Sequence, residues 1–281
     1  MLGYRHAFHA GNHADALKHL VLVQLTRHLA RKDKPFWFID THAGAGAYDL
    51  DAAHARKLAE YEGGIGRLWE RRDLPAPVAD YVDLVRAFNP GGRLRKYPGS
   101  PFFALWTTRG QDRLRLFELH GSDARLLRKN FQDAGKRAIV EGTDGFAGLK
   151  ALLPPPPRRA LILIDPSYEE KKDYDRVVGA LKDALARFSG GVYAVWFPHL
   201  LRREALDMPR RLKSLPAGNW LLASLRVREP AGNGLGMHGS GMFVLNPPWT
   251  LHDALADALP FLADALREDA GAGFALERSE A

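Results

Sequence analysis

Runs of apolar residues alternate along the chain with longer segments that mix apolar and polar positions. Five near-continuous apolar runs, typical of strands buried on both faces of a sheet, lie at residues 35–40, 114–120, 138–144, 160–165 and 191–197. Segments of helix length separate several of these runs. Because apolar strands that alternate with helical segments favour parallel pairing, the pattern predicts a doubly wound α/β fold.

Residues 12–32 have the features of a helix. Asn12 is suited to cap its start, Asp15 lies in the first turn, and Leu17, Leu20 and Leu25 contribute to an apolar stripe. Residues 251–266 show a similar pattern and predict a closing helix.

Two stretches depart from the alternation of strands and helices. Residues 50–105 hold helical pieces separated by the clusters LPAP and NPGG, which predicts a small inserted helical subdomain. The main domain would then comprise residues 1–49 and 106–281. Near the C-terminus, residues 219–229 and 241–249 are joined by a glycine-rich loop and predict an antiparallel strand pair at the edge of the sheet.

Composition narrows the possible functions. The chain of 281 residues has no cysteine, which excludes disulfides, thiolate zinc sites and a cysteine nucleophile and fits a reducing compartment. Its net charge of +7 favours a polyanionic partner. The longest apolar run near the N-terminus, Leu20–Val23, is too short for a signal sequence or a membrane span. We therefore expect a cytoplasmic protein without a membrane partner.

The segment FIDTHAGAG carries the first chemical signal. Asp40 ends a buried strand, and Gly44 and Gly46 allow a tight turn beneath a ligand, since ligands of open parallel sheets bind beyond the carboxyl ends of the strands. The dinucleotide fingerprint G-x-G-x-x-G is not met because Asp49 stands at its third glycine, which argues against a nicotinamide cofactor. Glu118, at the end of a later strand, is the residue type that binds ribose hydroxyls.

The segment LIDPSYEE carries the second signal. The Asp165 carboxylate and the Pro166 carbonyl can each accept one N–H of an exocyclic amine, and Tyr168 can stack on an extruded base. The alternative is an acid-capped turn with an exposed tyrosine. A related motif, NPPW at 246–249, follows the last strand of the predicted sheet, so we expect it to lie far from the catalytic turn.

Four histidines near the N-terminus suggest a metal site as an alternative. His9 and His13 have the spacing of one helix face, but a Gly-Asn break runs between them and no cysteine or clear carboxylate set completes a ligand group. We expect no metal.

Six motifs follow one another in a fixed order along nearly the whole chain: YRHAFHAGNHADALKH, DTHAGAGAY, YPGSP, FELH, GTDGF and LIDPSYE. Together they resemble the bacterial RlmJ family, the 23S ribosomal RNA adenine-N6 methyltransferases that use S-adenosylmethionine. The resemblance implies a Rossmann-like class I methyltransferase sheet, mostly parallel with an antiparallel edge strand. It also implies that an N6 amine of a specific adenine receives the methyl group.

The resemblance also implies roles for individual residues. Asp165 would be the catalytic acid, with Tyr4 and Lys18 near the cofactor and the target base. Cofactor contacts would fall on the residues that match the family's motifs, which are His19, His42, Ser100, Glu118, Asp144 and Gly145, next to the glycine turn at Gly44 and Gly46.

Two of these contacts have a physical rationale of their own, and one position departs from the family. Asp144 can accept from an adenine amino group, and Ser100 before Pro101 is suited to cap a helix whose free N–H groups would bind an anionic group. Ser167 stands where the family has a second proline, which puts in question the rigidity of the turn and the placement of Tyr168.

The substrate expected from these features is 23S ribosomal RNA, free or at an early stage of assembly, bound by a monomer. Lys171 and Lys172, just after the catalytic turn, are placed to contact its backbone. Two alternatives stay open: the same fold acting on another amine, such as guanine N2 or a protein glutamine, and a non-catalytic RNA-binding relative.

Overall fold

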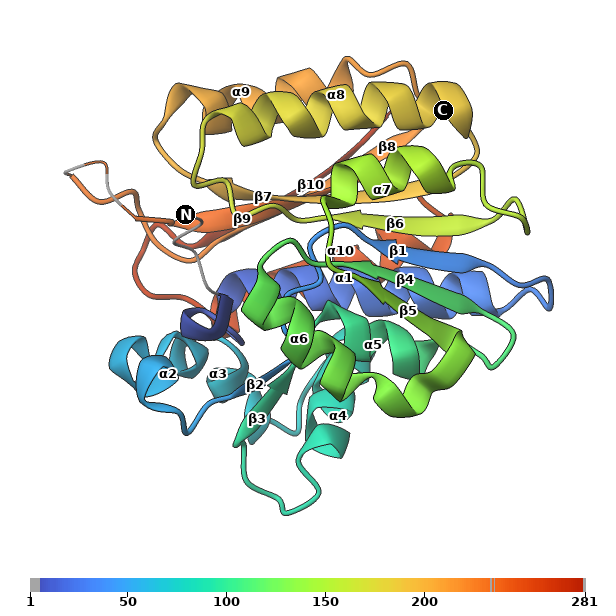
Figure 1. Cartoon of the computed structure of the whole chain (residues 1–281). Helices are drawn as coiled ribbons and strands as arrows, with labels where there is room; N and C mark the ends of the chain where they lie inside the picture. The colour runs from blue at the N-terminus through green and yellow to red at the C-terminus, as the bar shows by residue number, and fades with distance from the viewer. Residues whose placement is uncertain (1–5, 233, 235, 280–281) are drawn as a thin grey trace.

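The central sheet is the framework on which the rest of the chain is built (Figure 1). The computed structural model describes residues 6–232, 234 and 236–279, and in this part of the chain eight strands form one sheet in the order β10-β8-β9-β7-β6-β1-β4-β5. The strands β7, β6, β1, β4 and β5, which are neighbours in this order, pair in parallel. The pairs β7 with β9, β9 with β8, and β8 with β10 are antiparallel. Their bounds are β1 Trp37–Asp40, β4 Arg113–Phe117, β5 Ala138–Glu141, β6 Ala160–Ile164, β7 Val192–His199, β8 Trp220–Arg226, β9 Gly239–Leu245 and β10 Gly273–Arg278.

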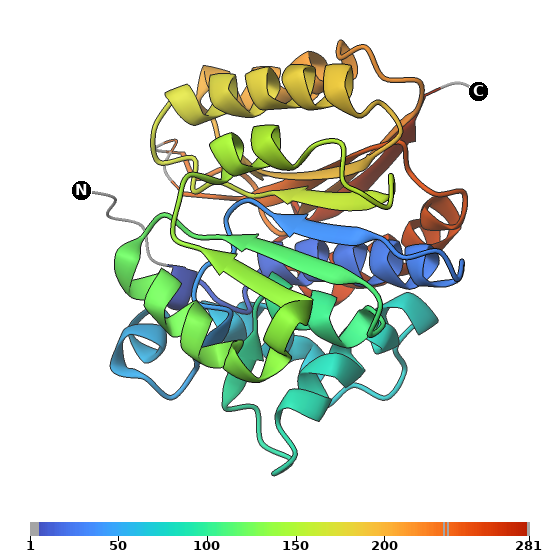
Figure 2. The ribbon, with the colours of Figure 1, turned by 45° about the vertical axis from the view of Figure 1, so that its right-hand side comes forward.

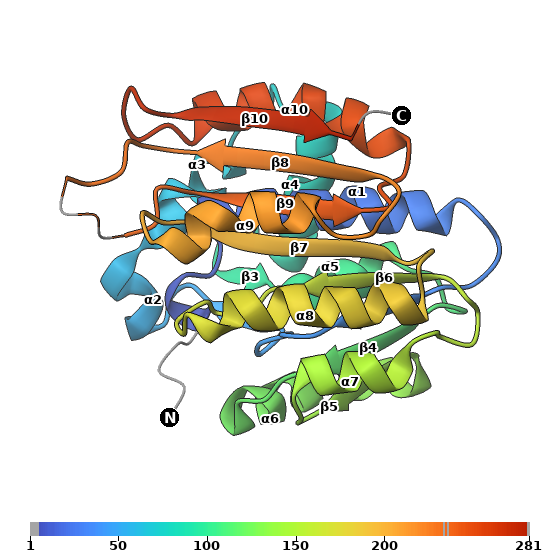
Figure 3. The ribbon, with the colours of Figure 1, turned by 90° about the horizontal axis from the view of Figure 1, so that it is seen from above.

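Helices cover both faces of this sheet and complete a three-layer α/β fold. One face carries α7 Gly145–Leu152, α8 Lys172–Arg187 and α9 Arg203–Lys213 (Figures 1 and 2). The other carries α1 His13–Ala30, α5 Ser100–Thr107, α6 Gly121–Asn130 and α10 Thr250–Ala265. Seen from above, α8 and α9 lie over β6 and β7 (Figure 3). The predicted α/β class, with a mostly parallel sheet and antiparallel strands at one edge, is confirmed.

The strand at the centre of the sheet explains why the apolar runs are continuous. Every residue of β6 is buried, because α1 covers one side and α8 the other, so there is no solvent face to call for polar residues. The neighbours of β6 are β1 and β7, and the three strands run parallel. Their carboxyl ends therefore meet at one edge of the sheet.

Helix α1 begins as its sequence predicts. The Asn12 side chain accepts hydrogen bonds from the N–H groups of Ala14 and Asp15, each at 3.0 Å. Gly11, at φ +82°, redirects the chain immediately before this cap. His9 therefore lies outside the helix, and the helical spacing that a metal site would need between His9 and His13 is absent.

The segment 50–105 contains helices, as expected, and also a strand. It holds α2 Ala53–Leu58, η2 Glu60–Gly63, α3 Ile65–Trp69, α4 Ala76–Phe88 and β3 Lys96–Pro98, which pairs with β2 Ala47–Asp49; η1 His6–Phe8 and η3 Gln132–Arg137 lie elsewhere. Tyr81 and Tyr97 belong to the same core as Leu17 of α1. The predicted boundary at residue 105 falls inside α5, so the segment is packed into the main core rather than appended to it.

The C-terminal strands differ from the expectation in one respect. The predicted antiparallel pair is β8 with β9, but this pair does not form the edge of the sheet, because β10 pairs with the outer side of β8. Within the described residues no helix is long and apolar enough to cross a membrane.

Candidate active site

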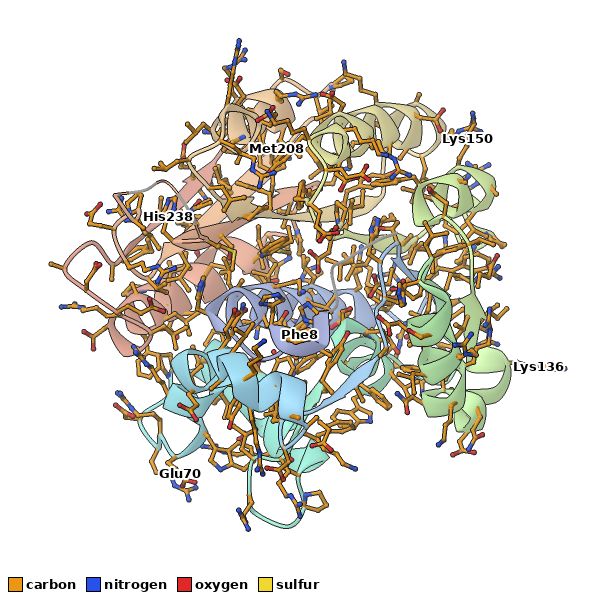
Figure 4. The ribbon with its side chains drawn as sticks, turned by 60° about the vertical axis from the view of Figure 1, so that its left-hand side comes forward. Phe8, Glu70, Lys136, Lys150, Met208 and His238 are labelled. Carbon is orange, nitrogen blue, oxygen red and sulfur yellow. The ribbon has the colours of Figure 1, made fainter. Side chains whose placement is uncertain are left out.

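A cavity of about 1090 Å³ opens at the carboxyl ends of β1, β4 and β6. Its walls also include the start of α1, the segment around Glu60 and the loop before β9. The view with the left-hand side forward shows η1, which carries Phe8, lying over the start of α1, with His238 in the loop that leads into β9 (Figure 4). Parallel sheets bind ligands at this edge.

Asp165 follows the last residue of β6 and faces the cavity, and Lys18 of α1 contacts it. Lys18 Nζ lies 2.6 Å from Asp165 Oδ2 and 2.9 Å from Asp15 Oδ1. Burial opposes the charge on Lys18, but the two carboxylates outweigh it and raise its pKa. Burial raises the pKa of Asp165, and Lys18 counteracts part of this shift.

Asp15 connects this ion pair to the N-terminal segment. Its Oδ2 atom lies 2.9 Å from His6 Nε2 and accepts the Gly11 N–H at 2.8 Å. Burial would raise the pKa of Asp15, but His6 and Lys18 hold it well below its usual range. From the sequence, Asp15 is expected only in the first turn of a helix. Its spacing from Lys18, one helical turn, was the signal that could have linked the two.

The structure places Tyr168 differently from the expectation. The residue is only 1% exposed, its ring packs against Tyr174 with centroids 4.6 Å apart, and its hydroxyl donates to the Trp196 carbonyl at 2.7 Å. A ring buried in this way offers no face to an extruded base, so its expected stacking role disagrees with this arrangement. The φ of Tyr168, +52°, turns the chain sharply after Ser167, and this turn buries the side chain. Pro166, Ser167 and Tyr168 are all among the residues that line the cavity, although the tyrosine has almost no exposed surface.

The turn after β1 is held by a buried carboxylate. Asp40 accepts from Ser100 Oγ at 2.7 Å and from the His42 N–H at 3.1 Å, and burial raises its pKa to about 7. Ser100 was predicted to cap α5, but the N-cap is Gly99 and the Ser100 hydroxyl is engaged by Asp40 instead. This correction has a physical reason, because a carboxyl with no exposed surface is costly to bury without hydrogen-bond donors, and the Ser100 hydroxyl supplies one.

The two glycines of this turn have different roles. Gly44, at φ +61°, lines the cavity, and a Cβ there would lie 2.2 Å from the Tyr48 hydroxyl. Gly46, at φ +80°, is not among the cavity's lining residues, and a Cβ there would meet Leu127 at 2.8 Å. Gly44 therefore shapes the site, whereas Gly46 permits the packing of α6 beneath it.

Glu118 is held at the end of β4 by the backbone on both sides. Its Oε2 accepts the Gly44 N–H at 2.8 Å and its Oε1 accepts the His120 N–H at 2.6 Å. Burial raises its pKa. Each carboxylate oxygen keeps further acceptor capacity, so the pair can bind two hydroxyls of a ligand.

Two histidines line the same cavity, His19 buried and His42 partly buried. Burial lowers the pKa of His42 to about 4, and its ring meets Phe146 edge-on at 5.0 Å. Burial also lowers the pKa of His19, whose Nδ1 lies 2.7 Å from the Tyr97 hydroxyl. Both rings are therefore neutral near pH 7 and suit an uncharged part of a ligand.

Asp144 and Gly145 lie at the start of α7. Asp144 Oδ1 accepts from the N–H groups of Phe146 and Ala147, at 2.8 and 3.1 Å, and its other oxygen pairs with Arg176. A Cβ on Gly145 would lie 2.0 Å from the Thr41 carbonyl oxygen. This close approach brings α7 against the end of β1, so that both residues line the cavity.

The expected substrate contacts are placed unevenly. Lys18 is central to the site. Lys171 pairs with Glu204 at 3.2 Å and Lys172 with Glu170; both lysines are exposed and neither lines the cavity. Tyr4 lies outside the described residues.

The competing motif NPPW lies at the end of the sheet opposite the cavity, where the parallel strands begin. In the pairing of β9 with β7, Leu245 faces Tyr193, so the end of β9 lies beside the start of β7. The expectation that NPPW is remote from the catalytic turn agrees with the structure. The reason given was wrong, since β9 is only two strands from β6 and its direction, not its rank, removes the motif from the site.

Several lining residues were not singled out from the sequence, notably Trp196 and Arg228. Trp196 lies near the end of a strand that was predicted, and strand position was the signal that could have identified it. His9 Nδ1 lies 2.9 Å from Glu60 Oε1, and burial lowers the pKa of His13 to about 4. Within the described ranges there is no group of three or more His, Cys, Asp or Glu residues that could hold a metal ion.

Comparisons with known proteins agree with the resemblance. Residues 33–276 match the family model described as "Ribosomal RNA large subunit methyltransferase D, RlmJ". The chain is 49% identical over 275 residues to ribosomal RNA large subunit methyltransferase J of Escherichia coli, covering 98% of this chain and 97% of the relative. It is 46% identical to the protein of the same name from Haemophilus influenzae, covering 95% and 94%.

A crystal structure of a protein from Legionella pneumophila superimposes with a TM-score of 0.87 at 36% identity, covering 97% of this chain and 98% of that one. The match extends through the main sheet and the segment 50–105 alike, because so little of either chain is left uncovered. The chain therefore belongs to the RlmJ family of ribosomal RNA large subunit methyltransferases.

Proposed function

We propose that this protein transfers a methyl group from S-adenosylmethionine to the N6 amine of one adenine in 23S ribosomal RNA. The observation that carries the proposal is the Lys18–Asp165 contact, which holds a carboxylate next to Pro166 in the wall of a cavity of about 1090 Å³. Family membership supports the reaction class and the RNA substrate.

The donor set of the cavity fits this cofactor. Glu118 would bind the ribose hydroxyls, Gly44 would permit close approach of the backbone, and neutral His19 and His42 would flank the cofactor. Asp144 would lie next to the adenine, although its carboxylate also caps α7 and pairs with Arg176. When bound, the cofactor supplies an electrophilic methyl group on a sulfonium sulfur.

The chain's own residues would hold the amine. Lys18 occupies Asp165 Oδ2, and in the described part of the chain no donor contacts Oδ1, which is left to accept one N–H. The Pro166 carbonyl would accept the other, because the proline ring restricts the backbone that carries it. Two acceptors on one amine favour a geometry in which its lone pair leaves the ring plane and points at the methyl group.

Lys18 keeps the acceptor ionised. Without a cation, a buried carboxyl would be protonated and would donate where the amine needs an acceptor. After transfer the methylated amine is acidic enough to lose its proton without a strong base, so Asp165 needs only to remain an acceptor. The positive charge that develops at the amine would then lie against the Asp165 carboxylate.

The finer features of the substrate complete the proposal. We infer a cytoplasmic monomer that acts on free RNA or on an early assembly intermediate, with Lys171 and Lys172 contacting the RNA backbone outside the cavity. The net charge of +7 supports a polyanionic substrate.

The test uses 23S RNA purified from a strain that lacks the enzyme. The RNA is incubated with the purified protein and labelled S-adenosylmethionine, digested to nucleosides and separated. Asp165→Asn is the variant and Asp175→Asn, on the exposed side of α8, is the matched control. We expect labelled N6-methyladenosine from the wild type and the control, and none from Asp165→Asn.

Each other outcome contradicts a specific part of the proposal. Label in a different nucleoside would reject adenine N6 as the target. Label in a protein fraction but not in RNA would reject the substrate class. Cofactor binding without any methyl transfer would favour a non-catalytic RNA-binding relative.

A further inference from the structure

Trp196 lies directly beside the proposed catalytic acid. In the parallel pairing of β6 with β7, Ile164 is opposite Val195, so the next positions along the two strands are Asp165 and Trp196. Neighbouring strands are about 4.8 Å apart, and these two residues leave the sheet on the face covered by α1. The Lys18 ammonium, which contacts Asp165, is 5.8 Å from the centre of the Trp196 ring.

The indole is open to the cavity, unlike the tyrosine expected to stack there. Both residues are among those that line the cavity, but Trp196 is partly exposed whereas Tyr168 is only 1% exposed. The Tyr168 ring packs beneath Trp196 at 5.9 Å between centroids, and its hydroxyl fixes the Trp196 carbonyl. The tyrosine therefore supports the tryptophan from behind.

An arginine accompanies the indole at the cavity. Arg202 also lines the cavity; it donates to the Tyr168 carbonyl at 3.3 Å and forms no ion pair within the described ranges. An aromatic face beside an arginine without a carboxylate partner suits a nucleotide, which offers a ring to the first and a phosphate to the second.

We propose that Trp196 provides the stacking face for the extruded target adenine and that Arg202 binds the phosphate of that nucleotide. This inference rests on the proposed function, since it assigns the place of its substrate. Tyr168 is then a positioning residue that acts through Trp196. Arg202 would meet the phosphate of the nucleotide while the indole meets its base.

The chain offers a matched control for Trp196. Trp220 on β8 is also partly buried, and it also has a lysine over its ring, with Lys213 Nζ 5.0 Å from the centroid. It does not line the cavity. Trp196→Phe and Trp220→Phe therefore remove comparable indoles, of which only one faces the site.

The first measurement is binding and does not depend on activity. Adenosine 5′-monophosphate is titrated into the full chain with S-adenosylhomocysteine present, and tryptophan fluorescence is followed, since a base stacked on an indole quenches it. We expect quenching in the wild type and in Trp220→Phe, and its loss in Trp196→Phe. No quenching in the wild type, or equal quenching in Trp196→Phe, would overturn the proposal.

The second measurement is methylation of 23S RNA. Loss of a base–aromatic stack predicts a fall in kcat/KM for RNA of roughly 10- to 100-fold in Trp196→Ala, with partial rescue in Trp196→Phe. Cofactor affinity by calorimetry should not change. Arg202→Ala should raise KM for RNA and leave kcat unchanged. Wild-type kinetics in both Trp196 variants would reject the stacking role.

The two tests separate this inference from the proposed function. If the wild type methylates no RNA yet its quenching depends on Trp196, the reaction assignment fails and the nucleotide site stands. If RNA is methylated and neither Trp196 variant differs from Trp220→Phe, the reaction stands and the assignment of the indole is wrong.

Discussion

Replacing Lys18 with methionine tests the electrostatic core of the site. The Lys18 side chain is 6% exposed and lies between two carboxylates, at 2.9 Å from Asp15 and 2.6 Å from Asp165. Methionine keeps much of the length and apolar stem but removes the charge. Removing one partner of a buried ion pair leaves the other charge without compensation, which costs about 3–5 kcal/mol.

The two carboxylates should respond differently. Asp15 keeps His6 at 2.9 Å and two donors in total, so it stays ionised. Asp165 loses the Lys18 contribution that opposed the effect of burial, and its pKa rises further. Lys18→Met should therefore need more acidic conditions to reach full stability, because a carboxyl with a raised pKa favours folding below its pKa and disfavours it above.

Urea unfolding and the pH dependence of kcat/KM are the assays. We expect a loss of about 3–5 kcal/mol in unfolding free energy at pH 7, and an acidic limb of the rate profile that moves to higher pH. The double variant Lys18→Met/Asp165→Asn should recover part of the stability, since it removes the charge left unpaired. A Lys18→Met protein with wild-type stability and an unshifted acidic limb would refute this account of the ion pair.

Three further predictions follow from the turns around the cavity. Burial raises the pKa of Asp40 to about 7, so its stabilising protonated form is lost as pH rises. Asp40→Asn keeps an acceptor for His42 and lacks this titration, so the unfolding free energy of the wild type should fall relative to that of the variant by roughly 4 kcal/mol between pH 4 and 7. A difference between the two urea curves that is the same at pH 4 and 7 would contradict this. Gly145→Ala should destabilise the protein by several kcal/mol in thermal unfolding, because its Cβ would lie 2.0 Å from the Thr41 carbonyl oxygen. An unchanged Tm would show that α7 can move away from Thr41 with no loss of stability. Glu118→Gln should weaken binding of S-adenosylhomocysteine about tenfold or more, because the amide NH₂ would face the backbone N–H of Gly44 or of His120. Calorimetry measures this binding, and an unchanged Kd would show that Glu118 does not bind the cofactor.

Much of the fold and the centre of the site could be predicted because they depend on strand ends. Asp40, Glu118 and Asp165 follow or end apolar runs, and parallel pairing brings such ends to one edge. The short or exposed strands could not be found in this way. β10 has no buried residue among its six, and β2 and β3 have three residues each.

The contacts that join distant parts of the chain could not be predicted from local patterns. Lys18 meets a carboxylate 147 positions later, and Ser100 meets one 60 positions earlier. In both cases a buried charge determines the partner, and burial is a property of the folded chain. Tyr168 was misplaced for a related reason, since its left-handed backbone turns the ring into the core.

Strand direction separates the two proline motifs more sharply than their sequences do. Both follow buried strands, and both include a residue at positive φ, Asn246 at +53° and Tyr168 at +52°. However, β6 runs parallel to its neighbours, so Asp165 lies at the cavity. Strand β9 runs antiparallel to β7, so Asn246 lies at the opposite end of the sheet. There its side-chain amide donates to the Ser189 and Gly191 carbonyls. An amide committed to two backbone acceptors holds a turn and has no donors left for a substrate. A motif of this type is therefore assigned to catalysis by the direction of the strand that precedes it, and the prolines alone do not decide the assignment.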